Sequence, residues 1–77
     1  MSAFKTVREK MNLTQGQIGQ LVGITQTEVS TIELGKRQPG LKLLLKYAIL
    51  ARQCKYDLLG DLVKQLDDEE AETYFQQ

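Results

Sequence analysis

The chain has 77 residues, in which ten Lys and Arg residues are balanced by ten Asp and Glu residues. This is the length of one small domain, whose core has no room for a deep enzymatic cavity. The chain contains no histidine and one cysteine, which excludes histidine catalysis, Cys/His zinc sites and intramolecular disulfides. The sequence has no recognisable nucleophile, metal-ligand or phosphate-loop pattern, so we expect no enzyme, no metal and no cofactor.

The zero net charge conceals an uneven distribution along the chain. Residues 1–55 carry nine Lys and Arg residues against three Glu residues (+6), and residues 56–77 carry one Lys against seven acidic residues (−6). A basic body of this kind suits a phosphate backbone. We therefore expect a DNA-binding domain at residues 1–66, followed by an acidic tail at residues 67–77.

Targeting and membrane signals are missing from the sequence as given. The N-terminal segment MSAFKTVREK lacks the apolar core of a signal peptide. The longest apolar stretch, residues 43–51, is interrupted by Lys46 and is too short to cross a membrane. A single thiol, Cys54, fits a reducing compartment. We expect a cytoplasmic protein with no membrane partner.

The first two predicted helices are short. The first spans about residues 3–11, and its buried face is formed by Phe4, Val7 and Met11. The second begins after Thr14, an N-cap residue whose capping-box partner is Gln17. It ends before Gly23, where a left-handed conformation is cheap only for glycine. Its apolar face is formed by Ile18, Leu21 and Val22.

The third predicted helix begins after Thr25, with Glu28 as its capping-box partner, and ends at Gly35. Val29 and Ile32 supply its inward face. Its outward face is polar and consists of Gln26, Thr27, Ser30 and Thr31. Each of these two capped helices is too short to be stable alone, but joined by a glycine-containing turn they form a candidate helix-turn-helix.

The last two predicted helices carry more apolar surface than one small core consumes. The fourth spans about residues 41–52, with a predicted core stripe of Leu41, Leu44, Leu45 and Ala48. The fifth spans about residues 56–66. The surplus predicts a homodimer, with an interface formed by Leu50, Tyr56, Leu58, Leu62, Val63, Tyr74 and Phe75. The two aromatic residues of the tail favour a continuation of the last helix over a frayed end.

The central stretch resembles the helix-turn-helix of Cro and cI-type phage repressors, which are also called the XRE-like family. The matching residues are Leu13-Thr14-Gln15, Ile18, Leu21, Gly23, Thr25-Gln26, Val29, Ile32-Glu33, Gly35-Lys36 and Pro39, with Arg8 upstream and Leu41, Leu44 and Ala48 downstream. Two departures are Gly19, where the family usually has Ala, and Asn12, where it usually has Gly. The resemblance implies an all-α, compact five-helix bundle, like the DNA-binding domain of lambda repressor.

The resemblance also implies roles for single residues. Arg8 is expected to pair with Glu33 and to tie the first helix to the third; the alternative is an exposed arginine of little energetic value. Gln15, at the first turn of the second helix, is expected to meet a phosphate together with the helix N-terminus. Further phosphate contacts are expected from Thr25, Lys36, Arg37 and Lys42, although loop cations can also be merely solvated.

The outward face of the third helix is expected to read bases. Glutamine can bond adenine N6 and N7 together, which suits Gln26, and Thr27 can contact a thymine methyl group. Ser30 and Thr31 continue this face, and their alternative is plain solvation. Glu28 can cap its own helix or accept from a cytosine amine; we predict the cap.

These features predict a sequence-specific transcriptional regulator, with repression as the expected mode. A homodimer would bind a palindromic double-stranded DNA operator, with half-sites about 34 Å apart. The resemblance places such a protein in bacteria or phages, at the nucleoid, with room for a regulatory protein partner. The alternative is a protein-interaction module, such as an antitoxin-like subunit, that holds a partner protein with its last two helices.

Overall fold

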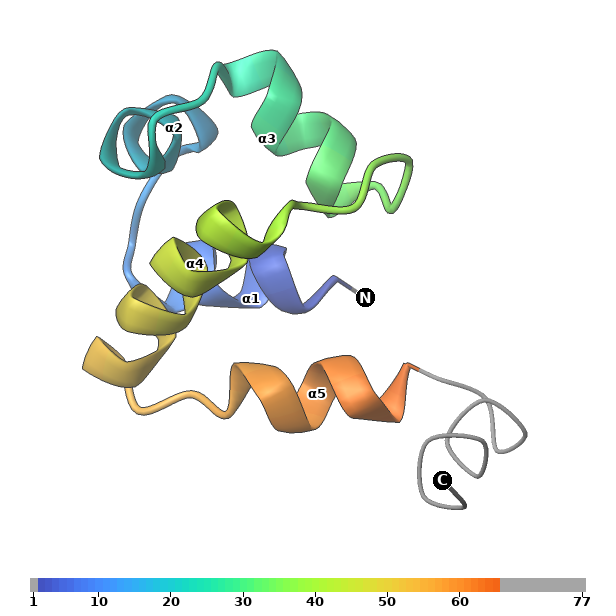
Figure 1. The fold of residues 1–77 in the computed structure, drawn as a ribbon. Helices are drawn as coiled ribbons and strands as arrows, with labels where there is room; N and C mark the ends of the chain where they lie inside the picture. The colour runs from blue at the N-terminus through green and yellow to red at the C-terminus, as the bar shows by residue number, and fades with distance from the viewer. Residues whose placement is uncertain (1, 66–77) are drawn as a thin grey trace.

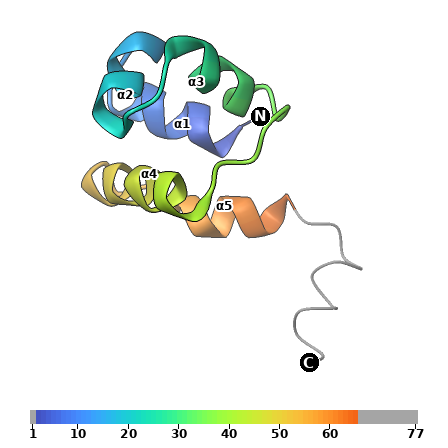
Figure 2. The same cartoon turned by 45° about the horizontal axis from the view of Figure 1, so that its top comes forward.

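The computed structural model describes residues 2–65. These residues form five α-helices, whose bounds are α1 (Ala3–Lys10), α2 (Gln15–Val22), α3 (Gln26–Glu33), α4 (Leu41–Gln53) and α5 (Leu58–Lys64). The helix pair α2 and α3 lies on one side of the bundle, and α5 lies on the opposite side, next to α1 and α4 (Figures 1 and 2). The predicted all-α class is confirmed. The tail at 67–77, with Tyr74 and Phe75, lies outside the described residues.

Local hydrogen bonds define the start of α2 and α3, as predicted. The Thr14 hydroxyl accepts from the Gln17 backbone N–H at 3.1 Å, and the Gln17 side chain accepts from the Thr14 backbone N–H at 2.9 Å. Thr25 and Glu28 repeat this capping box at the start of α3. Gly23 has a φ of 84° and ends α2 in the left-handed conformation. Reciprocal caps of this kind satisfy backbone donors that the helices cannot satisfy internally.

The core lies where α1, the helix pair and α4 meet. Its largest fully buried side chains are Tyr47, Ile18, Ile32, Val7 and Val29. The ring of Phe4 from α1 packs edge-on against the ring of Tyr47 from α4, with centroids 5.0 Å apart. Because α2 and α3 each bury apolar side chains in this one cluster, tertiary packing stabilises helices that are too short to persist alone.

The predicted core stripe of α4 is wrong in part: Leu44 and Ala48 are half-buried and pack against the core, but Leu41 and Leu45 do not. Leu41 and Leu45 are 73% and 55% exposed, whereas Leu43, Tyr47 and Ala51 are buried. Both sets follow the four-residue spacing of a helical face, and α4 is apolar nearly all round. Periodicity therefore could not choose between them, and the contact with α1 and α2 selects the face that carries Tyr47.

The predicted core position of Leu21 is also wrong, because this side chain is 59% exposed. Gly19 is the buried residue at this level of α2. A Cβ atom on Gly19 would lie 2.7 Å from the backbone oxygen of Ile24. The absence of a side chain therefore lets the turn and α3 pack directly against the backbone of α2, so this glycine serves the close approach of the two helices.

The start of α5 differs from the prediction. The helix begins at Leu58 rather than at Tyr56, because the side chain of Asp57 caps it by accepting from the Gly60 backbone N–H at 2.9 Å. Leu58 is only 3% exposed and belongs to the core. A side chain buried within the subunit has no surface left for a partner, so the predicted interface role of Leu58 is wrong.

Tyr47 carries a buried hydroxyl that has no hydrogen-bond partner among the described residues. A buried polar group without a partner costs free energy. We expect Tyr47→Phe to leave the free energy of unfolding unchanged or to raise it by up to about 1 kcal/mol, as measured by urea denaturation followed by circular dichroism. A loss of more than about 1 kcal/mol would show that the hydroxyl has a stabilising partner.

Tyr47→Phe is also expected to change how the stability of the protein depends on alkaline pH. Burial raises the pKa of Tyr47 to about 12, from its ordinary value of 10.0. A raised pKa means that folding stabilises the protonated form, so this contribution is complete below pH 10 and is lost as the pH rises toward 12. Tyr47→Phe should therefore lose less stability than the natural protein between pH 10 and 12.

Candidate nucleic-acid interface

The outward side of α3 presents the four residues predicted to read bases. Gln26 and Thr27 are exposed, and Ser30 and Thr31 are half-buried. Together with Gln15 from α2 they line one shallow depression on the surface. The depression is uncharged and polar, and the capped start of α3 holds it in place. A polar helix face of this kind can offer donors and acceptors to base edges in a major groove.

The hydroxyl hydrogen of Thr31 is already engaged in a hydrogen bond within α3. Its hydroxyl donates to the backbone oxygen of Thr27 at 2.8 Å. The hydrogen of the hydroxyl therefore points back along the helix, and toward a ligand Thr31 can offer only oxygen lone pairs or its methyl group. A base amine or the methyl group of thymine matches these groups.

A part-buried ion pair joins α1 to the end of α3. Arg8 Nε donates to Glu33 Oε2 at 2.7 Å, and Arg8 Nη2 donates to Glu33 Oε1 at 3.0 Å. The two side chains are 15% and 4% exposed. The hydrogen bond to Glu33 raises the pKa of Arg8 above its ordinary value. Arg8 Nη1 also donates to the backbone oxygen of Leu13 at 3.1 Å, so this one side chain fixes α1, the following turn and α3 together.

Gln15 extends this network to the candidate interface. Its Nε2 donates to Glu33 Oε1 at 3.2 Å, while its side chain lines the same depression as Gln26 and Thr27. An amide nitrogen has two hydrogens, so one remains for a ligand after the bond to Glu33. The carboxylate of Glu33 thus orients the amide that was predicted to meet a phosphate.

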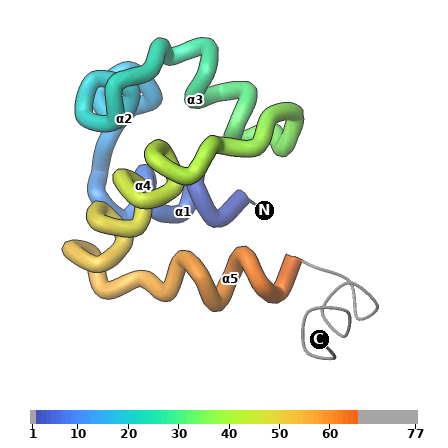
Figure 3. Tube along the Cα trace, in the orientation of Figure 1, coloured from blue at the N-terminus to red at the C-terminus, as the bar shows by residue number. Residues whose placement is uncertain are grey.

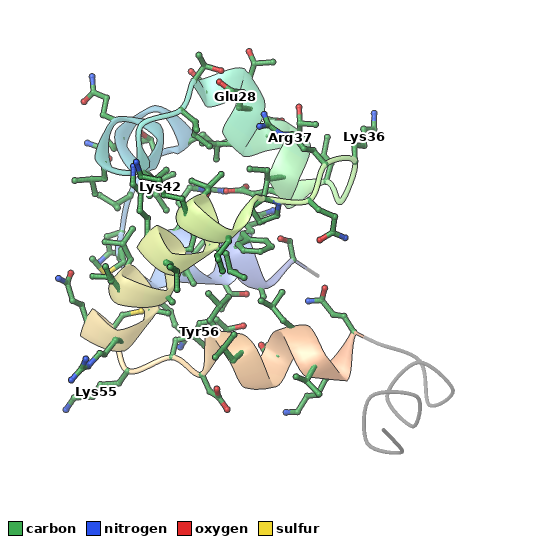
Figure 4. All side chains as sticks on the ribbon, viewed as in Figure 1. Glu28, Lys36, Arg37, Lys42, Lys55 and Tyr56 are labelled. Carbon is green, nitrogen blue, oxygen red and sulfur yellow. The ribbon has the colours of Figure 1, made fainter. Side chains whose placement is uncertain are left out.

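A second ion pair lies at the surface, on the other flank of α3. Arg37 Nη1 donates to Glu28 Oε2 at 2.7 Å, and these side chains are 48% and 35% exposed. Figure 4 shows the two labelled side chains next to one another above α4. The hydrogen bond from Arg37 is the largest cause that lowers the pKa of Glu28, followed by bonds from Thr25. Glu28 caps its helix as predicted, and both of its carboxylate oxygens are engaged.

Thr25 has no donor left for a phosphate. Its backbone N–H and its hydroxyl both donate to Glu28 Oε1 at 3.2 Å. The predicted phosphate contact of Thr25 therefore conflicts with its role as the helix cap.

The remaining predicted phosphate ligands are exposed. The connection between α3 and α4 runs beyond the end of α3 before it returns to α4 (Figure 3). Lys36 lies in this connection (Figure 4). Lys42 lies in the first turn of α4. Neither lysine forms an ion pair within residues 2–65. Both cations are therefore available to a phosphate backbone.

A helix-turn-helix family model matches residues 4–57. The chain belongs to the Cro/C1-type, XRE-like helix-turn-helix family. The match runs from α1 to the cap of α5 and includes the whole candidate interface, so this Cro/C1-type domain is a DNA-binding regulatory domain. No curated protein and no solved structure matches the chain significantly. Within residues 2–65, no helix has the length and apolar character to span a membrane.

Two contacts of this Cro/C1-type domain escaped sequence reasoning. Lys46 Nζ donates to the backbone oxygen of Val22 at 3.1 Å, so a cation from α4 caps the C-terminus of α2. The pair between Glu28 and Arg37 joins residues nine positions apart across a loop. Helical spacing cannot identify either contact, because each one joins α2 or α3 to a side chain from outside that helix.

Proposed function

We propose that the protein is a transcriptional repressor that binds a palindromic operator as a homodimer, with α3 of each subunit in a major groove. The observation that carries this proposal is the polar, uncharged outer face of α3, which lies beside Gln15 and is held in place by a helix cap and a part-buried ion pair. A face fixed in this way meets base edges with little loss of conformational freedom. Occupancy of the operator would exclude RNA polymerase.

Sequence would be recognised by a few side chains of this face. Gln26, at the start of α3, bonds adenine through N6 and N7. Thr27 contacts a thymine methyl group. Thr31 accepts from a base amine or contacts a methyl group, since its hydroxyl hydrogen is already engaged. Ser30, between them, supplies a further hydroxyl at the same groove edge.

Phosphate contacts would set the register of the domain on DNA. Gln15 contributes its second amide hydrogen together with the N-terminus of α2. Lys36 and Lys42 contribute uncompensated positive charge, and Arg37 contributes N–H donors beside its partner Glu28. Contacts of this kind position the protein without specifying sequence.

An apolar face on α4 and α5 supports the proposed homodimer. Leu41, Leu45 and Ile49 recur every four residues along α4, and all three are exposed. Beside them, an apolar groove between α4 and α5 is lined in part by Leu44, Leu59, Leu62 and Val63. A contiguous apolar surface on so small a domain is typical of an interface. Of the predicted interface residues, Val63 and Leu62 lie at this groove.

Leu50 and Tyr56, two further residues of the predicted interface, are half-buried. The hydroxyl of Tyr56 donates to Asp61, and its ring lies under the ammonium group of Lys10, with Nζ 5.9 Å from the ring centroid. These two side chains are engaged within the subunit. The proposed interface is therefore centred on the exposed stripe of Leu41, Leu45 and Ile49 rather than on Leu50 and Tyr56.

The proposal is tested by binding of the purified protein to DNA fragments from around its own gene, over a salt series. We expect one fragment to be preferred, with an affinity that falls steeply with salt. Gln26→Ala should cost about 1–3 kcal/mol of binding free energy on the operator and relax base preference at one position. The salt dependence should not change, because Gln26 carries no charge.

Gln53→Ala is the matched control, because Gln53 is an exposed glutamine at the end of α4. It should bind the operator as the natural protein does. If no fragment is preferred even at low salt, the operator proposal is wrong. The apolar face of α4 and α5 would then favour the alternative of a module that holds a partner protein.

A further inference from the structure

The reading face of α3 is flanked by two glutamates, one on each side, and each is paired with an arginine from outside the helix. Glu33 and Arg8 form the part-buried pair, which joins α1 to α3. Glu28 and Arg37 form the exposed pair, at the flank where the loop after α3 begins its return. The exposed pair adds little to stability, and its position beside the DNA-binding face points to a role in binding.

Glu28 is held more firmly than an ordinary surface glutamate. Its Oε1 accepts from the backbone N–H and the hydroxyl of Thr25, each at 3.2 Å. Its Oε2 accepts from Arg37 at 2.7 Å. The carboxylate is therefore fixed to the first turn of α3, and it holds the guanidinium of Arg37 at this place.

The charge of this pair is zero. An arginine that neutralises a DNA phosphate releases condensed counterions, which is the source of sequence-independent binding. Arg37 can donate N–H groups to a phosphate while it is paired, but it brings no net charge. If Arg37 left the pair for a phosphate, the carboxylate of Glu28 would remain uncompensated beside the DNA backbone. Lys36 and Lys42 have no such competitor within residues 2–65.

We propose that Glu28 is an intramolecular competitor of DNA phosphates for Arg37, and that it thereby limits the affinity of this protein for DNA of any sequence. This inference rests on the proposed function, because it assumes that α3 meets DNA. Glu28 acts through Arg37 and contacts no base. Its role is to set how much of the binding free energy comes from phosphate contacts and how much from base contacts.

Glu28→Gln separates this role from the capping role. Glutamine fits the capping box as well as glutamate does, so the cap of α3 is kept while the charge is lost. On a DNA fragment of scrambled sequence, we expect roughly fivefold tighter binding at low salt, and a salt dependence steeper by about one phosphate contact. In the double variant that carries both Glu28→Gln and Arg37→Gln, the tighter binding and the steeper salt dependence should both disappear.

Glu9→Gln is the matched control, since Glu9 is an exposed glutamate of α1 that forms no ion pair within residues 2–65. Glu9→Gln changes the net charge by the same amount as Glu28→Gln, but it releases no arginine from an ion pair. The inference is overturned if Glu28→Gln behaves like Glu9→Gln, if it weakens binding, or if the gain persists in the double variant. Circular dichroism of each variant establishes that the fold is retained.

The scrambled fragment makes this test independent of the operator. Preference for one fragment tests the proposed function, whereas the salt dependence on scrambled DNA tests the competition for Arg37. A protein without an operator preference would still show the steeper salt dependence if the inference is right. A protein with a clear operator, and with the same salt dependence before and after Glu28→Gln, would overturn the inference alone.

Discussion

Replacing Glu33 by glutamine is expected to lower the free energy of unfolding by about 1–3 kcal/mol, because it leaves the part-buried guanidinium of Arg8 without its counter-charge and without one of its hydrogen-bond acceptors. Glu33 accepts two hydrogen bonds from Arg8 and one from Gln15, and its side chain is only 4% exposed. Since small domains are stable by about 5–15 kcal/mol, this loss is a large share of the total. Urea denaturation followed by circular dichroism measures it.

Glu28→Gln provides the matched control, because the same substitution is made in the same helix at an exposed pair. Its effect on the free energy of unfolding should be clearly smaller, because exposed ion pairs contribute little to stability. Arg8→Lys provides a milder test of the pair between Arg8 and Glu33, since lysine keeps the charge but loses the two-pronged geometry. Equal costs for the Glu33 and Glu28 substitutions would contradict the structural role of this pair.

Replacing Leu45 by glutamate is expected to dissociate the proposed homodimer and to lower the affinity for the full operator by about a hundredfold or more, since the two half-sites are then bound independently. Leu45 is 55% exposed in the subunit and lies in the middle of the exposed apolar stripe of α4. Its replacement should leave the fold intact, because the core does not use this side chain. Sedimentation measures the mass of the particle, and binding to a half-site provides the reference affinity.

Gln53→Glu introduces the same charge in the same helix, at its C-terminal end, one turn beyond Ile49, and replaces none of the apolar side chains of the stripe. It should leave both the dimer and the operator affinity unchanged. A Leu45→Glu protein that remains dimeric would place the interface elsewhere. A natural protein that is monomeric at micromolar concentration would instead leave the apolar face of α4 and α5 to another partner.

The short-range features of the helix-turn-helix follow from the sequence. Thr14 with Gln17 and Thr25 with Glu28 form their capping boxes within single turns, so residue types at fixed spacing suffice to predict them. Gly23 takes the left-handed conformation for the same local reason. The family match, which the central motif predicted, covers this local pattern.

The resemblance predicted one long-range contact that composition and spacing could not. Arg8 and Glu33 are 25 residues apart, and the structure joins them by two hydrogen bonds. Neither the resemblance nor the spacing of residues predicted the pair between Glu28 and Arg37. Arg37 was expected to contact a phosphate, and only the return of the loop after α3 brings it to a carboxylate.

The sequence by itself determined where each helix of the motif begins and which face of α3 is polar, because caps, turns and helical spacing involve neighbours in the chain. Tertiary structure alone decided which side of α4 is buried, because that helix is apolar on several sides and only contact with α1 and α2 distinguishes them. The same packing buries Gly19 and exposes Leu21 on α2. Burial depends on what lies opposite a side chain, and the periodicity of one helix carries no information about its neighbours.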